Sequence, residues 1–392
     1  MAAQAKWPMK RLGDLAEFRN GVNYNKSSFG EGVKVVGVAD FQDYTKPRYP
    51  ELTQINPDGI VTERNILRDG DIIFVRSNGN HELIGRSLFI EQPPEEITHS
   101  AFTIRLRFTA RGICPQFYAY CFRTPLIRQA LTAQGSGTNI NNPNQDILNS
   151  LEVPFPPLPV QHRIAGILSA YDELIENSQR RIRILEAMAR SLYREWFVHF
   201  RFPGHEKLPR VPSPLGEIPK GWEVKKLSDI LELNYGKALK KEDRRQGAFP
   251  VYGSSEIVGT HDASLTKNPG IIVGRKGNVG SIFWCNDDFF VIDTTYFVTS
   301  SLPLRFLFYV LPTLNFLNSD AAVPGLSRNQ AYTLDILVPP VPLLTKFCRL
   351  ADGFEQQVGA LQHQMHNLRR TRDLLLPRLL SGQMELAKDS PG

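Results

Sequence analysis

The sequence predicts two mixed α/β (α+β) domains that alternate with two long helices, and an internal pseudo-twofold repeat relates the halves. Three observations favour this fold class. The chain has 392 residues, which is too long for one ordinary core. Four sequence blocks recur in the same order in both halves. In each half, a proline-rich strip precedes a long segment with apolar residues every seven positions, which is typical of a coiled coil.

The first recurring block lies near the start of each half. The segment "WPMKRLGDLAEFRNG" at 7–21 aligns without gaps to "WEVKKLSDILELNYG" at 222–236, so that Gly21 matches Gly236. Three further blocks follow in both halves, and they pair 71–80 with 270–280, 144–158 with 329–343, and 185–197 with 368–380. Four ordered matches indicate a duplicated architecture.

The globular part of each half reads as mixed α/β structure. Short β-rich runs such as "DIIFV" and "GIIVG" are broken by Gly, Asn and Pro, and a few helical stretches lie between them. We therefore expect globular domains at 1–158 and 204–343, long helices at 159–203 and 344–385, and a disordered tail at 386–392.

Each long helix follows a strip whose prolines can continue neither a helix nor a strand ladder, as in "VPFPPLP" at 153–159. After each strip, apolar residues at heptad spacing form a narrow seam, which is stable only against another such seam. The predicted seam residues are Leu168, Ile175, Ile182, Leu185, Leu192, Trp196, Phe354, Leu361, Leu368 and Leu375. The sequence thus predicts an antiparallel two-helix coiled coil that holds the two domains apart.

An alternative is that each helix covers its own domain as a separate amphipathic element. Polar residues at or beside the seam, namely Ser178, Gln357 and Arg372, argue against this alternative, because packing on an isolated domain would prefer apolar groups there.

Composition narrows the function classes. The net charge of +6 permits a polyanionic partner without requiring one. The four cysteines are scattered without a C-x-x-C pair, which argues against a zinc site and a secreted disulfide scaffold and favours the cytoplasm. No stretch is apolar enough to span a membrane. The stretch "GRKGNVGS" at 274–281 lacks the spacing of a phosphate-cradling loop, and no cluster has metal-ligand spacing, so we expect no catalytic site.

Loops that follow the β-rich runs carry hydrogen-bond donors flanked by glycines. Arg reads guanine and Asn reads adenine bidentately in the DNA major groove. The candidate DNA-binding residues in these loops are Arg76, Asn78, Asn80, His81, Arg275, Lys276 and Asn278. The alternative is a solvated hairpin tip in which Asn and Gly satisfy only turn geometry.

Two further segments are candidates for contact with DNA. The basic segment at 234–247 carries Lys240, Lys241, Arg244 and Arg245, which suit phosphate binding, although a solvated charge run explains them equally well. The polar loops at 135–142 and 324–330 contribute Thr138, Asn139 and Arg328. The alternative for these loops is capping of the following helix through Asn or Ser.

The two α/β domains and the two similar helices, each entered through a "PPLP"-like or "PPVP"-like strip, resemble the specificity subunit of type I restriction-modification systems over essentially the whole chain. The segments that carry the resemblance are 151–176, 336–358 and the "RKGNVG" turn at 275–280. One departure is that the Glu-Gln pair usual in the family after the proline strip is here Val160-Gln161 and Thr345-Lys346.

The resemblance implies a non-catalytic subunit in which each globular part is a target recognition domain that reads one half of a split double-stranded DNA sequence. The paired helices set the spacer. Two modification (methyltransferase) subunits dock on the helices, and restriction/translocase subunits complete the complex, so S-adenosylmethionine, ATP and Mg²⁺ belong to partner subunits and no cofactor to this chain. Arginines expected on the outward faces of the helices are candidate docking contacts, with plain solvated charges as the alternative: Arg180, Arg183, Arg190, Arg194, Arg369 and Arg370.

Two other function classes remain open. A recognition protein of a type IIG-like or phage-defence system would use the same domains with a different catalytic partner. A structural coiled-coil tether without DNA affinity would shift no duplex in a gel at low salt.

Overall fold

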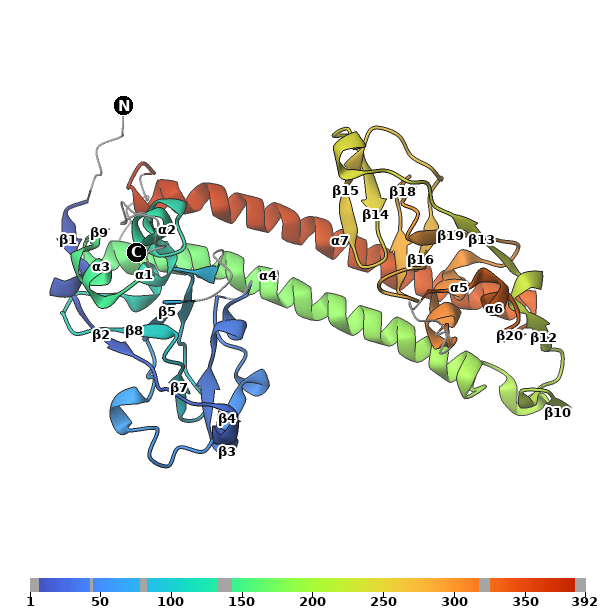
Figure 1. The fold of residues 1–392 in the computed structure, drawn as a ribbon, viewed down its shortest axis with the longest axis horizontal. Helices are drawn as coiled ribbons and strands as arrows, with labels where there is room; N and C mark the ends of the chain where they lie inside the picture. Colours follow the sequence, from blue (N-terminus) through green and yellow to red (C-terminus); the bar gives the residue numbers. More distant parts are fainter. Residues whose placement is uncertain (1–6, 43–44, 78–82, 133–142, 317–324, 385–392) are drawn as a thin grey trace, which may run out of the picture. The chain divides into compact units, whose positions relative to one another are not determined.

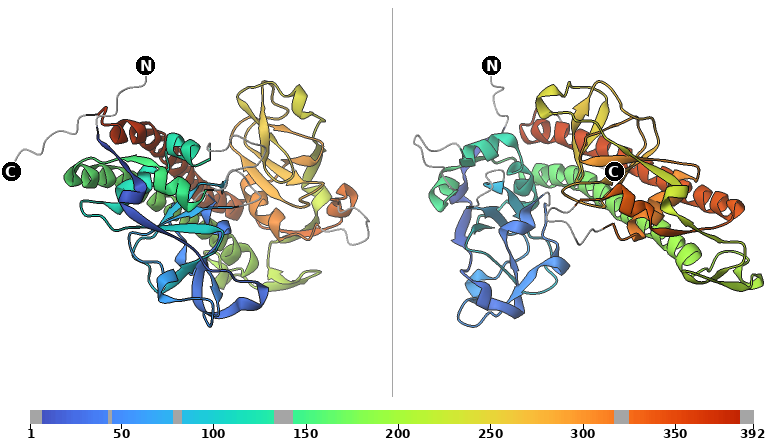
Figure 2. Two further views of the ribbon diagram at one scale, coloured as in Figure 1. Left: turned by 60° about the vertical axis from the view of Figure 1, so that its left-hand side comes forward. Right: turned by 45° about the vertical axis from the view of Figure 1, so that its right-hand side comes forward.

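The computed structural model of the chain forms two compact units. The first unit comprises Met1–Asn177 with Gln364–Gly392, and the second comprises Ser178–His363. Each unit is an α/β domain with one part of both long helices (Figures 1 and 2). The predicted fold class is confirmed. The structure describes residues 7–42, 45–77, 83–132, 143–316 and 325–384.

The first domain contains three sheets. A two-stranded sheet pairs β1 (Met9–Arg11) with β9 (Glu152–Pro154). The four-stranded antiparallel sheet has the order β2 (Ala16–Asn20), β8 (Thr103–Phe108), β5 (Ile72–Val75) and β6 (Ser87–Phe89). The three-stranded sheet has the order β4 (Thr53–Ile55), β3 (Phe29–Val36) and β7 (Ile97–His99), with β3 parallel to β7.

The second domain repeats this plan sheet by sheet. A two-stranded sheet pairs β12 (Glu223–Lys226) with β20 (Asp335–Val338). The four-stranded sheet has the order β13 (Leu231–Tyr235), β19 (Thr295–Ser300), β16 (Gly270–Gly274) and β17 (Ile282–Cys285). The three-stranded sheet has the order β15 (Ile257–His261), β14 (Phe249–Tyr252) and β18 (Phe290–Val291), with β14 parallel to β18. The hairpin β10 (Arg210–Ser213) and β11 (Gly216–Pro219) precedes these sheets. The predicted internal repeat is therefore confirmed.

The central strands β5 and β16 are apolar at consecutive positions because both faces of their sheet are covered. Side chains alternate between the two faces of a strand. In β5, Ile72 and Phe74 join the core beneath the helices, whereas Ile73 and Val75 join the core between the two sheets. In β16, Ile271 and Ile272 divide in the same way between two cores.

Short helices complete each domain: α1 (Pro115–Cys121), α2 (Pro125–Thr132) and α3 (Gln145–Ser150) in the first, and α5 (Leu304–Val310) and α6 (Arg328–Tyr332) in the second. The polar residues directly before α3 and α6 cap these helices, whereas the loop at 135–142 lies outside the described residues. The side chain of Asn144 accepts a hydrogen bond from the backbone of Ile147 at 2.8 Å, and that of Ser327 accepts one from Gln330 at 3.4 Å. Side chains of this kind satisfy amides that a helix start leaves unpaired.

The long helices α4 (Leu158–Tyr193) and α7 (Val341–Leu380) begin directly after prolines of the predicted strips. The carbonyl of Pro157 accepts a hydrogen bond from Val160, and that of Pro340 accepts one from Leu343. A single π-helical turn, Arg194–Val198, follows α4. Near the start of α4, the fully buried Gln161 accepts a hydrogen bond from the Cys114 amide and donates to two carbonyls, which fastens the helix to the first domain.

The two long helices run antiparallel. In the first unit, Leu168 near the start of α4 shares a core with Leu379 and Leu380 at the end of α7. In the second unit, the rings of Tyr193 and Phe347, near the end of α4 and the start of α7, lie 6.3 Å apart. The helices also contribute to the domain cores, so the coiled-coil packing and the covering of a domain that the sequence offered as alternatives occur together.

The predicted seam residues are buried or half-buried. Leu168, Ile175, Ile182, Trp196 and Leu361 are buried, and the half-buried members are Leu185, Leu192, Phe354, Leu368 and Leu375. Of the three polar residues predicted at or beside the seam, Ser178 is buried, Arg372 is half-buried and Gln357 is exposed.

Each unit contains a tyrosine hydroxyl that donates to a carboxylate of a long helix. In the first unit, Tyr120 lies 2.9 Å from Asp172 of α4, and in the second, Tyr309 lies 3.5 Å from Glu355 of α7. Burial, and then the neighbouring carboxylate, raise the pKa of Tyr309 to about 12, so the hydroxyl keeps its proton and remains a donor. Asp172 and Glu355 are both the fifteenth residue of their helices, so this contact is part of the repeat although the amino acids differ.

Candidate nucleic-acid interface

The same backbone arrangement ends the central strand of each domain. Arg76 follows β5, and its amide donates to the carbonyl of Phe102 at 2.8 Å. Arg275 follows β16, and its amide donates to the carbonyl of Thr294 at 2.9 Å. The two predicted arginines therefore occupy equivalent places at the end of a buried strand, where a rigid sheet fixes the start of the side chain.

A glycine lies beside this strand end in each domain. A Cβ atom at Gly21 would lie 2.1 Å from the carbonyl oxygen of His99, and one at Gly236 would lie 2.1 Å from that of Ile292. Because no side chain fits at such a distance, glycine at these matched positions allows the backbone after β2 and β13 to approach the neighbouring segment closely.

In the second domain, the structure brings Arg275 and Arg328 together on one aromatic ring. Tyr235 is the last residue of β13 and is 48% exposed. The guanidinium carbon of Arg275 lies 4.9 Å from the centroid of its ring, and that of Arg328 lies 5.1 Å from the same centroid. Distances below about 6 Å are those of cation–π contacts. Tyr235 was not among the predicted site residues.

The segment that carries Arg328 is tied to the strand end that carries Arg275. The amide of Leu326 donates to the carbonyl of Arg275 at 2.8 Å, and Lys276 forms an antiparallel β-bridge with Gly325. The hydroxyl of the buried Tyr296 donates to the carbonyl of Leu326, and burial, and then the adjoining Tyr235, raise the pKa of Tyr296 to about 12. Backbone contacts between the two segments thus hold Arg275 and Arg328 close to each other.

Lys276 and Asn278 lie in an exposed turn beyond Arg275. Gly277 and Gly280 adopt φ angles of +82° and +75°, which residues other than glycine rarely adopt. The turn returns to Gly274, whose backbone accepts a hydrogen bond from Gly280. Its exposed lysine and asparagine can contact a ligand, but their placement also suits the solvated turn that the sequence left as an alternative.

We call the place where these strand ends and the following helix start meet the corner of a domain. In the corner of the first domain, the positions that match Tyr235 and Arg328 carry amide side chains. Asn20 is the last residue of β2, as Tyr235 is the last residue of β13. Gln145 is the first residue of α3, as Arg328 is the first residue of α6. The side-chain nitrogen of Gln145 lies 3.5 Å from the side-chain oxygen of Asn20. Neither amide was predicted as a site residue, although the alignment of 7–21 with 222–236 does place Asn20 opposite Tyr235.

Five of the predicted residues of the first domain lie outside the described residues, namely Asn78, Asn80, His81, Thr138 and Asn139.

The predicted basic cluster of the second domain lies beside a different sheet from Arg275. Arg244 donates to the carbonyl of Val258 in β15 at 2.6 Å, and the backbone of Arg245 contacts His261 of the same strand. Arg244 is thus engaged within the domain, whereas Lys240 and Lys241 are exposed. The basic cluster therefore lies beside the three-stranded sheet. Tyr235 and Arg275, in contrast, lie at strand ends of the four-stranded sheet, and Arg328 contacts Tyr235 there.

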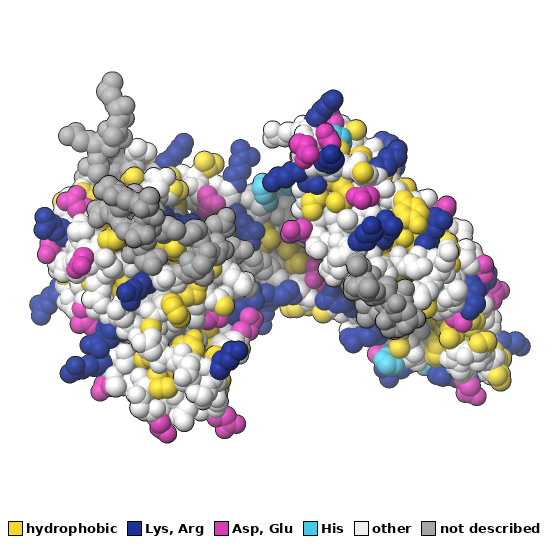
Figure 3. All heavy atoms as spheres, in the orientation of Figure 1, with side chains coloured by type: hydrophobic (Ala, Val, Ile, Leu, Met, Phe, Trp, Pro, Cys, Tyr) yellow, Lys and Arg dark blue, Asp and Glu magenta, His cyan; other side chains and the backbone are white. Residues whose placement is uncertain are grey.

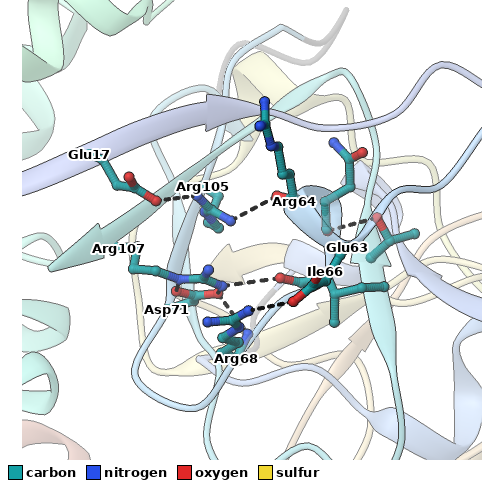
Figure 4. Close-up of polar contacts among 10 residues, drawn as sticks. Glu17, Glu63, Arg64, Ile66, Arg68, Asp71, Arg105 and Arg107 are labelled. Atoms are coloured by element: carbon teal, nitrogen blue, oxygen red, sulfur yellow. Dashed lines mark hydrogen bonds and ion pairs between the residues drawn. The ribbon is translucent and has the colours of Figure 1, made fainter. Parts of the chain in front are cut away.

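Two arginines of β8 in the first domain are engaged by carboxylates of the same domain. Arg107 binds Asp71 through two hydrogen bonds of 2.8 and 2.7 Å, and Arg105 binds Glu17 at 2.8 Å (Figure 4). Asp71 is buried, and its hydrogen bonds to Arg107 raise the pKa of that guanidinium. Because charged groups are paired when they are removed from water, these arginines stabilise the sheet and are not candidates for DNA contact.

Charge alone does not mark a candidate interface. On the face drawn in Figure 3, Lys and Arg side chains are interspersed with Asp and Glu on each unit. In the described part of the chain, no group of three or more His, Cys, Asp or Glu side chains is arranged to hold a metal ion. No helix among the described residues has the length and hydropathy needed to cross a membrane.

Comparisons with known proteins agree on one family. The family model for the type I restriction modification DNA specificity domain matches residues 4–187 and 219–341, one match in each half. The MjaIX type I restriction enzyme specificity subunit of Methanocaldococcus jannaschii is 28% identical, and the match covers 70% of each chain. A putative MjaX specificity subunit of the same organism is 22% identical over 97% of this chain and 94% of its own.

A solved structure shares the fold over the whole chain. The type I restriction-modification S subunit from M. genitalium superposes with a TM-score of 0.61 and 19% identity, and the match covers 99% of this chain and 98% of the other. At this identity the likeness concerns the fold, and it includes two α/β domains and two long helices.

Proposed function

The chain belongs to the type I restriction modification DNA specificity family, and from that membership we propose that each of its domains binds one half of a bipartite double-stranded DNA sequence at the corner formed by Arg76 or Arg275. The observation that carries this proposal is the recurrence of that corner. A strand end, an arginine and a close-approach glycine are repeated in both domains.

The corners have the chemistry that base reading requires. Arg275 and Arg328 present guanidinium groups, and Asn20 and Gln145 present amides, which are the side chains that form bidentate hydrogen bonds with guanine and adenine. The arginine starts from a rigid strand end in each domain, which fixes the direction of the side chain better than a loop does. Lys240 and Lys241 are suited to contact phosphates, because they are exposed and not engaged by β15.

The long helices are proposed to set the number of base pairs between the half-sites and to dock two modification subunits, with restriction subunits completing the complex. The six arginines expected to face outward are all exposed: Arg180, Arg183, Arg190, Arg194, Arg369 and Arg370. The antiparallel pairing of similar helices offers two similar surfaces, which suits two copies of one partner. S-adenosylmethionine, ATP and Mg²⁺ would be bound by those partners.

The experiment that tests this function is a map of N6-methyladenine, obtained by long-read sequencing of cells that express the chain with its modification subunit. We expect methylation at a split sequence of two short half-sites with a fixed spacer. Methylation at a continuous sequence, or none above that of cells with the modification subunit alone, would overturn the proposal.

A further inference from the structure

Tyr235 is an exposed aromatic side chain at the edge of the proposed DNA-binding corner. The residue is 48% exposed, although Leu231 and Leu233 of the same strand are buried. The ring contacts Tyr296 beneath it, with centroids 5.0 Å apart, and the two guanidinium groups lie within 4.9 and 5.1 Å of its centroid. The ring of Tyr235 therefore packs against the domain on Tyr296, and both arginines contact it.

The two arginines keep their positive charge available. Arg275 donates through Nη1 to the carbonyl of Asp293 at 3.0 Å, which uses one of its five N–H groups. Among the described residues, no carboxylate forms an ion pair with Arg275 or Arg328, in contrast to the paired Arg105 and Arg107 of the first domain. Two like charges share this corner without a neutralising partner, which suits a ligand that supplies acceptor atoms.

The contact with Tyr235 limits how the guanidinium groups can turn. A guanidinium that stacks on a ring uses its face and leaves the N–H groups of its edge for a ligand. Tyr332 of α6 accepts a hydrogen bond from the amide of Leu233 at 2.9 Å, which holds the helix carrying Arg328 to the strand carrying Tyr235. The contacts with Tyr235 and this hydrogen bond thus hold both guanidinium groups at the ring before a ligand binds.

We infer that Tyr235 is a positioning residue that orients Arg275 and Arg328 to read guanine in the half-site bound by the second domain. This inference rests on the proposed function. Guanine presents two adjacent acceptors, O6 and N7, in the major groove, and the two N–H groups of a guanidinium edge match them. A phosphate contact needs positive charge but not a ring that fixes the plane, as a lysine can supply it.

At the matching described positions of the first domain, Asn20 stands where the second domain has Tyr235 and Gln145 stands where it has Arg328. The effect of Tyr235 is therefore confined to one half-site. This difference provides an internal control within the same chain.

The test compares Tyr235→Leu with Tyr235→Phe in the full chain, co-expressed with the modification subunit and read by N6-methyladenine mapping. Duplexes carrying the mapped wild-type sequence, with each base pair of each half-site changed in turn, then serve as probes for binding by the purified complex. Circular dichroism and the thermal unfolding midpoint of each variant show whether the second domain remains folded. Gln145→Ala is the matched change in the first domain.

We expect Tyr235→Leu to lose discrimination at a guanine of one half-site by roughly five- to 150-fold. Tyr235→Phe should retain discrimination at that guanine, since the ring remains. Gln145→Ala should alter only the other half-site. The inference is overturned if Tyr235→Leu folds and retains full discrimination, if it weakens binding equally to every probe, or if the affected position is not guanine. If the wild-type chain directs no split methylation sequence, the proposed function itself fails.

Discussion

The guanidinium of Arg372 in α7 lies 2.6 Å from the carboxylate of Asp172 in α4, so an ion pair joins two helices through residues 200 positions apart in the sequence. Asp172 also accepts hydrogen bonds from Arg123 and Tyr120 of the first domain. Burial alone would raise the pKa of Asp172, but Arg123 and Arg372 together hold it below its usual value. The contact therefore links the helix pair to the first domain.

Replacing Asp172 should destabilise the first unit. Asp172→Asn removes the carboxylate that Arg372 and Arg123 share, in a site where both Asp172 and Arg372 side chains are about one-fifth exposed. Removing one partner of a buried pair costs about 3 kcal/mol. The matched control is Asp373→Asn, because Asp373 also contacts Arg372 but is 62% exposed, so its loss should cost less than about 0.5 kcal/mol. Urea unfolding of both variants measures the difference, and equal losses would show that the burial of Asp172 is unimportant.

Gly21 and Gly236 should not tolerate alanine. The added Cβ would lie 2.1 Å from a carbonyl oxygen in either domain, so we expect Gly21→Ala and Gly236→Ala to cost about 3 kcal/mol or more. At Gly359, in the exposed part of α7, a Cβ atom would have no other heavy atom within 4 Å. Gly359→Ala should therefore stabilise the helix by up to about 1 kcal/mol. Thermal unfolding of the variants tests the opposite signs. A neutral Gly236→Ala would mean that the backbone can move apart at this corner.

The first domain should become less stable in acid because of His99. Burial, and then Arg105 and Arg107, lower the pKa of His99 from 6.5 to about 3. Between these values the unfolded chain binds one more proton than the folded chain, so stability is full above pH 6.5 and falls as the pH falls, by about 1.4 kcal/mol per pH unit. Replacing the imidazole by the amide of His99→Asn removes this contribution.

The measurement is the loss of unfolding free energy between pH 6.5 and pH 5 in the wild type and in His99→Asn. We expect the wild type to lose about 2 kcal/mol more than the variant over this range. Equal losses would mean that His99 takes up its proton in the folded domain, for instance because water reaches its Nε2 atom, which has no hydrogen-bond partner among the described residues.

The fold could be predicted from the sequence because the patterns that specify it are periodic or repeated. The heptad spacing of Leu168, Ile175 and Ile182 predicted the buried side of α4, and the alignment of Gly21 with Gly236 predicted equivalent places in two domains. The Tyr120–Asp172 contact and its counterpart in the second unit could not be predicted, because they join residues far apart in the chain and the recurring blocks contain neither Tyr120 nor Asp172.

Only some residues of the candidate site could be predicted from the sequence. Arg275 and Arg328 were predicted from loop composition, but Tyr235 was not, because an aromatic residue at the end of a strand is more often part of a core. Its neighbour Gly236 approaches the backbone of Ile292 so closely that a Cβ atom would lie 2.1 Å from the carbonyl oxygen. That approach depends on two segments far apart in the sequence, so it became visible only in the folded domain.

Lengthening a long helix should lengthen the spacer of the DNA target. Four residues inserted after Glu176 add about 6 Å of rise, close to two base pairs, and introduce a stutter that locally unwinds a coiled coil. We expect the mapped methylation sequence to gain one or two unread base pairs between unchanged half-sites. An active variant that keeps its spacer, or that changes its half-site bases, would contradict the role of the helices as a ruler.

The central claim is that the two equivalent corners read the two halves of one DNA target, and the methylation map of Arg76→Ala beside that of Arg275→Ala tests it most directly. Sites in separate domains, with no shared partner, should act independently. We predict that each variant relaxes the sequence at one base pair, costing about 1–3 kcal/mol, and that the two variants affect different half-sites. If both variants alter the same half-site, or if both fold and leave the methylated sequence unchanged, the claim is contradicted.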